Sequence, residues 1–142
     1  MPELRPAALW LRLAAAIYDL FPLIGLWMLT AALSLAATRG ALDAHHPPLA
    51  YRVALLLVTA AYFVISWSRG GQTIGMRAWR LKLTAADGGA LPWPRALLRF
   101  GVALISLFAF VLGFVWCLID RDRRAWHDIA ARSRLVREPT IG

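Results

Sequence analysis

Two charged residues interrupt the first apolar stretch of the chain. Arg12 and Asp19 stand seven positions apart between Leu9 and Ala37. Seven helical steps of ~100° return to nearly the same face, two turns further along. Because a charge in hydrocarbon costs about 2.5–3.5 kcal/mol on insertion scales, such residues normally face protein or water and mark function. An arginine beside a carboxylate on one membrane helix predicts an ion or proton site; alternatively, both side chains reach the membrane interface.

Composition predicts an integral membrane protein. The chain has 142 residues, 60% of them hydrophobic, and a mean hydropathy of +0.58. The net charge is +8, and the basic residues flank the apolar stretches. That placement favours topology signals and contacts with anionic lipid over nucleic acid. The single Cys117 excludes an internal disulfide, and no spacing of ligand residues predicts a metal or a cofactor.

Two stretches predict transmembrane helices, over residues 8–37 and 50–68. Leu20–Ala37 holds 18 residues without a charge, enough to cross most of a hydrocarbon core of ~30 Å. Trp67 ends the second stretch, where an indole prefers the interface. Pro22 leaves two interpretations open: it kinks the first helix, or it begins the true span and leaves a surface segment before it.

We expect residues 69–99 to form a basic loop, within which the sequence begins to alternate between apolar and polar residues. Trp79–Thr84 alternates apolar and polar residues, which predicts a half-buried strand. Asp87–Gly89 is a turn sequence, and we expect Leu91–Trp93 to pair back, giving a small cytoplasmic β-hairpin over residues 79–93. Basic residues around this hairpin and in the tail are predicted to contact lipid headgroups: Arg77, Arg80, Lys82, Arg95, Arg99, Arg123 and Arg124.

The third hydrophobic segment, residues 100–119, has 20 uncharged residues. A full span would place the six arginines of the tail, residues 120–142, opposite the N-terminus, against the positive-inside rule. The tail segment Ser133–Val136 is also strand-like and can pair with the hairpin only from the same side. We therefore favour a re-entrant or bent segment that breaks between Ser106 and Gly113. A continuous third span is the alternative, because no proline interrupts it and a helix satisfies its own backbone.

The fold class follows from these elements. We expect an all-α membrane protein with two transmembrane helices, a third hydrophobic segment and a small cytoplasmic β-hairpin, in a single domain over residues 1–142. The N-terminus is expected in the cytoplasm.

Three features together resemble the RDD family of small bacterial membrane proteins, over nearly the whole chain. They are the charged first helix, the Gly71–Arg77 block (GQTIGMR) and Trp126-His127-Asp128. The family takes its name from one arginine and two aspartates, and the resemblance matches these to Arg12, Asp19 and Asp128. One departure is Arg132-Ser133, where the family often has a Gly-Thr pair, so a glycine turn is lost.

The resemblance implies a bacterial inner-membrane location and suggests transport. A small cation or proton-coupled transporter would use Arg12, Asp19 and Asp128 as an ion or proton site, with His127, titrating near neutrality, and Trp126 as accessories. Two or three helices cannot enclose a path, so transport would need a homo-oligomer or another membrane protein as partner.

The alternative is a non-transporting scaffold, assembly factor or lipid-contacting accessory protein. In that case Arg12, Asp19 and Asp128 would form a structural salt-bridge cluster that ties the tail to the first helix. No spacing of residues indicates an enzyme, so we expect none. The expected partners are anionic headgroups of the bilayer and membrane proteins.

Overall fold

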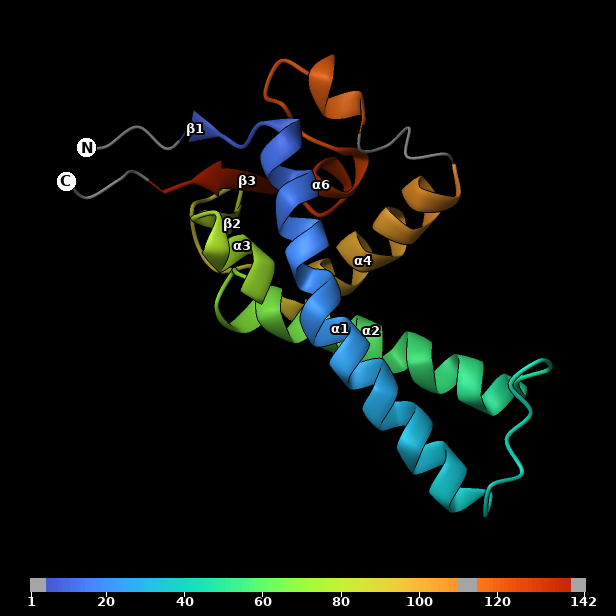
Figure 1. Ribbon diagram of the computed structural model, residues 1–142. Coiled ribbons are helices and arrows are strands. Elements are labelled where there is room, and N and C mark those ends of the chain that lie inside the picture. The colour runs from blue at the N-terminus through green and yellow to red at the C-terminus, as the bar shows by residue number, and fades with distance from the viewer. Residues whose placement is uncertain (1–4, 110–114, 139–142) are drawn as a thin grey trace.

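Two long helices dominate the computed structural model, which describes residues 5–109 and 115–138 (Figure 1). Helix α1 spans Leu9–Ala37 and α2 spans Leu49–Arg69, and the most apolar 18-residue stretch of each has a mean hydropathy of 1.9. They are the two described helices that are long and apolar enough to cross a membrane. Pro22 lies inside α1, which continues through it, so the helix begins well before this proline.

Helices α1 and α2 form an antiparallel pair and pack against each other. The indole Nε1 of Trp27 on α1 donates to the hydroxyl of Thr59 on α2 at 2.9 Å. The outward faces of both helices are apolar and exposed: Phe21 is 74% exposed, Met28 69% and Leu57 63%. A water-soluble protein would bury side chains of this kind.

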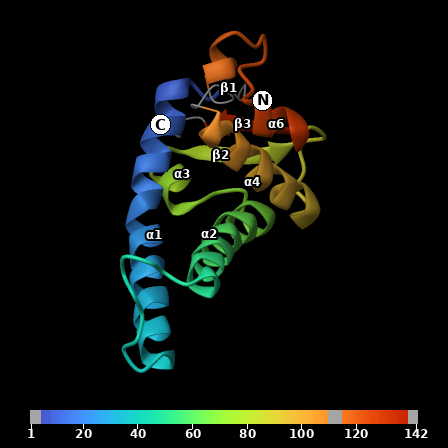
Figure 2. The ribbon, with the colours of Figure 1, turned by 90° about the vertical axis from the view of Figure 1, so that its right-hand side faces the viewer.

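A small antiparallel sheet forms the opposite end of the molecule from the 38–48 loop (Figure 2). It comprises β1 (Arg5–Pro6), β2 (Leu81–Ala85) and β3 (Ser133–Arg137), in the order β1-β3-β2. Leu83 of β2 lies opposite Leu135 of β3. The sheet thus joins the N-terminal segment, the basic loop and the tail at one place.

The predicted hairpin over residues 79–93 is wrong in its second half. The strand and the turn are present, but β2 pairs with β3 rather than with Leu91–Trp93. Trp93 instead begins helix α4 (Trp93–Phe108), after Pro92 and with a proline in its first turn. Proline has no N–H to donate to a strand ladder and suits the start of a helix, which explains the outcome.

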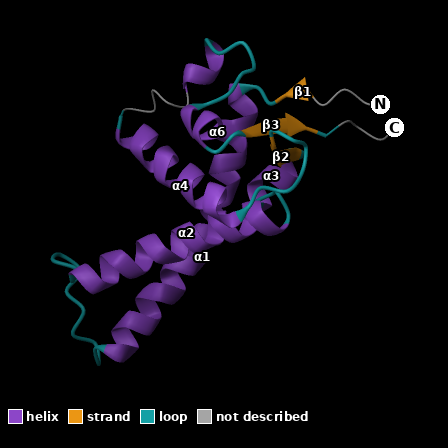
Figure 3. Cartoon of the chain, turned by 180° about the vertical axis from the view of Figure 1, so that it is seen from behind, coloured by secondary structure: helices purple, strands orange, loops and turns teal. Residues whose placement is uncertain are grey.

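Helix α4 covers the first part of the third hydrophobic segment and ends at Phe108. A short 3₁₀ helix, η1 (Trp116–Leu118), lies near the end of the segment, and helix α6 (Trp126–Ala130) follows it. Helix α6 packs on α4 and on β3 (Figure 3). Residues 110–114, where the predicted break partly falls, lie outside the described residues.

A compact core fills the space between the sheet and the helices. Leu81, Leu83 and Leu135 from the sheet join Leu11 of α1 and Phe100 of α4. The short helix α3 (Ile74–Ala78) closes this core against α1. We call the sheet with α3, α4, η1 and α6 the cap, because it covers the N-terminal end of α1.

Candidate functional site

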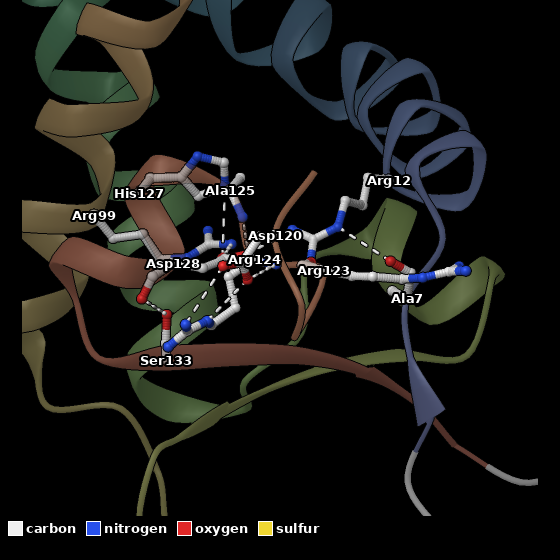
Figure 4. Close-up of polar contacts among 10 residues, drawn as sticks. All are labelled: Ala7, Arg12, Arg99, Asp120, Arg123, Arg124, Ala125, His127, Asp128 and Ser133. Atoms are coloured by element: carbon white, nitrogen blue, oxygen red, sulfur yellow. Dashed lines mark hydrogen bonds and ion pairs between the residues drawn. The ribbon is translucent and has the colours of Figure 1, made fainter. Parts of the chain in front are cut away.

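Asp128 is the centre of a buried charge cluster in the cap (Figure 4). Its side chain is fully buried, and its Oδ2 accepts a hydrogen bond from the Nη1 of Arg12 at 2.5 Å. Its Oδ1 accepts from the Nη2 of Arg99 at 2.7 Å. The backbone N–H of Ala125 donates to Oδ2 at 3.2 Å, so the carboxylate also caps the start of α6. Three distant segments of the chain therefore meet at one carboxylate.

Arg12 is held on all three sides of its guanidinium. Besides Asp128, its Nε donates to the carbonyl of Ala7 at 3.3 Å, and its second terminal nitrogen donates to the carbonyl of Arg123 at 2.9 Å. Only 7% of the residue is exposed. Arg12 thus joins α1 to the loop before α6, and its guanidinium is buried within the protein.

Arg99 was missed as a member of this cluster, and its predicted headgroup contact is wrong. It is 4% exposed, and its guanidinium carbon lies 4.2 Å from the centre of the Trp67 ring, in a cation–π contact. Its place on α4 explains this, because Ala96 and Phe100 on the same helix are buried too. Sequence reasoning had placed Arg99 at the end of a solvated loop.

The other predicted headgroup contacts remain predictions, and the structure leaves their side chains at least partly accessible. Arg77, Arg80, Lys82 and Arg123 are exposed, while Arg95 and Arg124 are half-buried. Lys82 forms an ion pair with Glu138 at 3.8 Å. Arg124 forms ion pairs with Asp120 at 3.1 Å and with Asp122 at 3.4 Å.

The electrostatics of the cluster keep Asp128 ionised and His127 neutral. Burial alone would raise the pKa of Asp128, but the guanidiniums of Arg99 and Arg12 outweigh it and hold that pKa well below its usual range. Burial, assisted by the charge of Arg99, lowers the pKa of His127 to about 3. The Nε2 of His127 lies 3.6 Å from Oδ1 of Asp128. His127 therefore does not titrate near neutrality, contrary to the expectation from sequence.

Asp19 belongs to a second cluster, formed with neutral donors. Its Oδ1 accepts from the hydroxyl of Tyr62 at 2.7 Å and from the backbone N–H of Gly75 at 2.8 Å. Its Oδ2 accepts from the hydroxyl of Thr73 at 2.6 Å, and the residue is 3% exposed. The carboxylate thereby fixes the loop after α2 to the middle of α1.

The Gly71–Arg77 block supplies the geometry of this second cluster. Thr73 is the N-cap of α3 and accepts a hydrogen bond from the N–H of Met76 at 3.1 Å. A Cβ on Gly75 would lie 2.0 Å from the carbonyl oxygen of Ala15 and 2.9 Å from Cγ of Asp19. Only glycine allows α3 to approach α1 this closely, and sequence reasoning assigned no such role to the block.

The structure thus divides the predicted triad between two clusters. Arg12 and Asp128 are joined, whereas no ion pair in the described parts of the chain links Asp19 to either of them. Trp126 is half-buried and its ring centre lies 6.2 Å from that of Trp116. Over residues 5–109 and 115–138, no group of three or more His, Cys, Asp or Glu side chains is arranged to hold a metal ion.

The protein is mainly helical and has two candidate membrane spans, α1 and α2. Buried polar clusters fix these two helices to the cap. The chain belongs to the RDD family, whose model matches residues 6–132 and so confirms the resemblance. That match includes Arg12, Asp19, Asp128 and the Gly71–Arg77 block. Comparisons with curated proteins and with solved structures give no match.

Proposed function

We propose that this protein is a membrane-embedded scaffold or accessory module whose basic cap lies against the anionic cytoplasmic leaflet of a bacterial inner membrane. Helices α1 and α2 cross the bilayer, and the Arg12–Asp128–Arg99 cluster acts as a latch that fixes the cap to α1. The observation that carries the proposal is the closure of this cluster. Asp128 is fully buried and both of its oxygens are occupied by guanidiniums, so no ligand is needed to complete it.

The surfaces of α1 and α2 support their membrane placement. Within the most apolar windows of these helices, 6% and 0% of the residues are buried. Such long apolar surfaces are stable in lipid and unfavourable in water. The basic residues gather at the cap end, as the positive-inside rule expects for a cytoplasmic face.

The apolar exterior of α4 and η1 supports a third segment that enters the bilayer without crossing it. Leu107 is 58% exposed, Phe108 83% and Ile119 73%. Arg99, the one charged residue between Leu97 and Ile119, points into the latch. Because both ends of the segment are tied to the cap, the exposed apolar side chains would dip into the cytoplasmic leaflet and return.

A latch role makes a direct prediction for Asp128→Asn. The substitution leaves two guanidiniums buried without their carboxylate, and breaking a buried pair in this way typically costs about 3–5 kcal/mol. We expect a much lower yield in membranes and faster proteolysis of the tail after Asp128.

Purified wild-type protein in liposomes should show no sodium, potassium or proton flux above empty liposomes. A robust flux would contradict a non-transporting role.

A second candidate function, cation or proton-coupled transport in a homo-oligomer, is favoured by Asp19. This carboxylate is buried in a candidate membrane helix, and in the described chain it accepts hydrogen bonds from neutral groups of Tyr62, Thr73 and Gly75. The same liposome assay decides between the candidates. Flux that disappears in an Asp19→Asn protein of normal yield supports transport, whereas loss of the protein itself supports a structural carboxylate.

A further inference from the structure

A cavity of about 220 Å³ lies beside the latch and has no role in the proposed scaffold. The polar and charged side chains of its lining come from four segments: Arg12 of α1, Thr84 of β2, Arg134 of β3, and Asp122 with Arg124 before α6. We call it the arginine pocket. Its volume is several times the share of about 30 Å³ that one water molecule has in the liquid. A tetrahedral oxyanion therefore fits with room to spare.

The sheet sets the spacing of two of these residues. Thr84 lies directly opposite Arg134 in the β2–β3 register, so their side chains stand on the same face of the sheet. Arg134 is exposed and Thr84 is half-buried, which leaves the hydroxyl and the guanidinium accessible from the cavity. Arg12 contributes a buried positive charge to the same wall.

The charge of the lining is unbalanced. The lining holds three guanidiniums and one carboxylate, but Arg12 is also paired with Asp128, and Arg124 with Asp120. Arg134 has no ion pair in the described chain, so the excess positive charge of the lining is that of Arg134. Guanidinium forks match the oxygens of a phosphate, and an anionic phosphate group would balance this charge.

We propose that the arginine pocket binds a phosphate group. The group has two chemical sources, a free phosphate compound or the headgroup of phosphatidic acid. Arg134 and Thr84 would contact it from the sheet and Arg124 from the loop, while Asp122 opposes it. The pocket is separate from the scaffold role, because binding of free phosphate requires neither membrane contact nor transport.

Opposite effects of two substitutions test the pocket. The full-length chain in detergent micelles is titrated with inorganic phosphate by calorimetry, with potassium chloride at matched ionic strength as the blank. Arg134→Gln removes a donor and should weaken binding about tenfold, as expected for a charge-assisted hydrogen bond. Asp122→Asn removes the repelling carboxylate, while Arg124 keeps its ion pair with Asp120, so the substitution should tighten binding several-fold. Neither residue belongs to the latch.

Arg137→Gln is the matched control. Arg137 is exposed on the same strand, three positions along and therefore on the other face of the sheet, and it does not line the pocket. Its substitution should leave phosphate binding within a factor of two. The pocket proposal is overturned if phosphate shows no saturable binding to the wild-type chain, or if Arg134→Gln and Arg137→Gln weaken it equally.

Nanodiscs distinguish the two sources of phosphate. If the pocket takes a lipid headgroup, adding phosphatidic acid to phosphatidylcholine discs should weaken phosphate binding by competition in the wild-type chain. If the pocket takes soluble phosphate compounds, the two kinds of disc should give the same affinity. Both results support a phosphate pocket, and neither depends on whether the liposome flux of the scaffold test is present.

Discussion

At the scale of single residues, the two family aspartates have different environments. Asp128 is neutralised by two guanidiniums, whereas Asp19, within the described residues, accepts from hydroxyl and amide donors and has no ion pair. The first arrangement favours a permanently ionised, structural carboxylate. The second arrangement buries the Asp19 carboxylate where α1, α2 and α3 meet. Protonation of Asp19 would therefore affect the packing of these three helices.

His127 gives a prediction about pH. Its pKa is about 3 in the folded chain against an ordinary 6.5, so between these values the unfolded chain binds a proton that the folded chain does not. Stability should therefore fall as the pH drops from 6.5, by at most about 1.4 kcal/mol per pH unit from this residue. The contribution of Asp128, whose pKa is lowered from 3.8, is lost only at more acidic pH.

The measurement is denaturant unfolding in micelles between pH 7 and pH 4.5. His127→Gln should reduce the pH slope, although it lowers stability at pH 7. His45→Gln, in the exposed 38–48 loop, is the control and should leave the slope unchanged. Equal slopes for the wild-type chain and His127→Gln would show that the buried imidazole is not the group responsible.

Gly75 gives a prediction about packing. Gly75→Ala places a methyl group 2.0 Å from a backbone oxygen of α1, so α3 must move away and the bonds to Asp19 must lengthen. Overpacking of this kind costs about 1–3 kcal/mol, and unfolding midpoints should fall accordingly. Gly25→Ala, where nothing lies within 4 Å, is the matched control and should gain up to about 1 kcal/mol of helix stability. A similar midpoint for both variants would refute the close approach.

At the scale of elements, the pattern of neighbouring residues predicted where helices and strands form better than it predicted which elements pack or pair with each other. Hydropathy and period gave α1, α2 and the strands at β2 and β3, because these depend on neighbouring residues. The hairpin partner predicted for β2, Leu91–Trp93, was wrong, since alternation predicts a strand and not what pairs with it. The tail segment Ser133–Val136, expected to be able to pair with this hairpin from the same side, does pair with β2. Arg99 was misplaced for a similar reason: its cluster forms only when α4 packs on α6, a contact between residues that are distant in sequence.

The candidate site was predicted residue by residue but not as an arrangement. Arg12, Asp19 and Asp128 were identified, and the structure shows that Arg12 and Asp128 touch. Arg12 and Asp19 were expected to act together because they share one face of α1. That face contacts two different elements: Arg12 binds Asp128 of α6, and Asp19 binds Gly75 of α3. Tyr62, hidden in an apolar run, could have been suspected from its hydroxyl, because a buried Tyr hydroxyl usually needs a partner.

At the scale of the whole molecule, the sheet and the latch collect the N-terminal segment, the basic loop and the tail at one end. The 38–48 loop lies at the other end, beyond α1 and α2 (Figure 1). Only two crossings of the bilayer are compatible with this arrangement if α1 and α2 are the spans. The third hydrophobic segment must then return to the side from which it started.

Cysteine accessibility in intact cells and inverted vesicles tests this account most directly. In a Cys117→Ser background, single cysteines are placed at exposed positions of the three regions, as Asp87→Cys, Arg137→Cys and Ala41→Cys. We predict that a membrane-impermeant thiol reagent labels positions 87 and 137 only from the cytoplasmic side, and position 41 only from the opposite side. Labelling of positions 87 and 137 from opposite sides would mean three full crossings, which would separate β2 from β3 and Arg12 from Asp128 and contradict the latch.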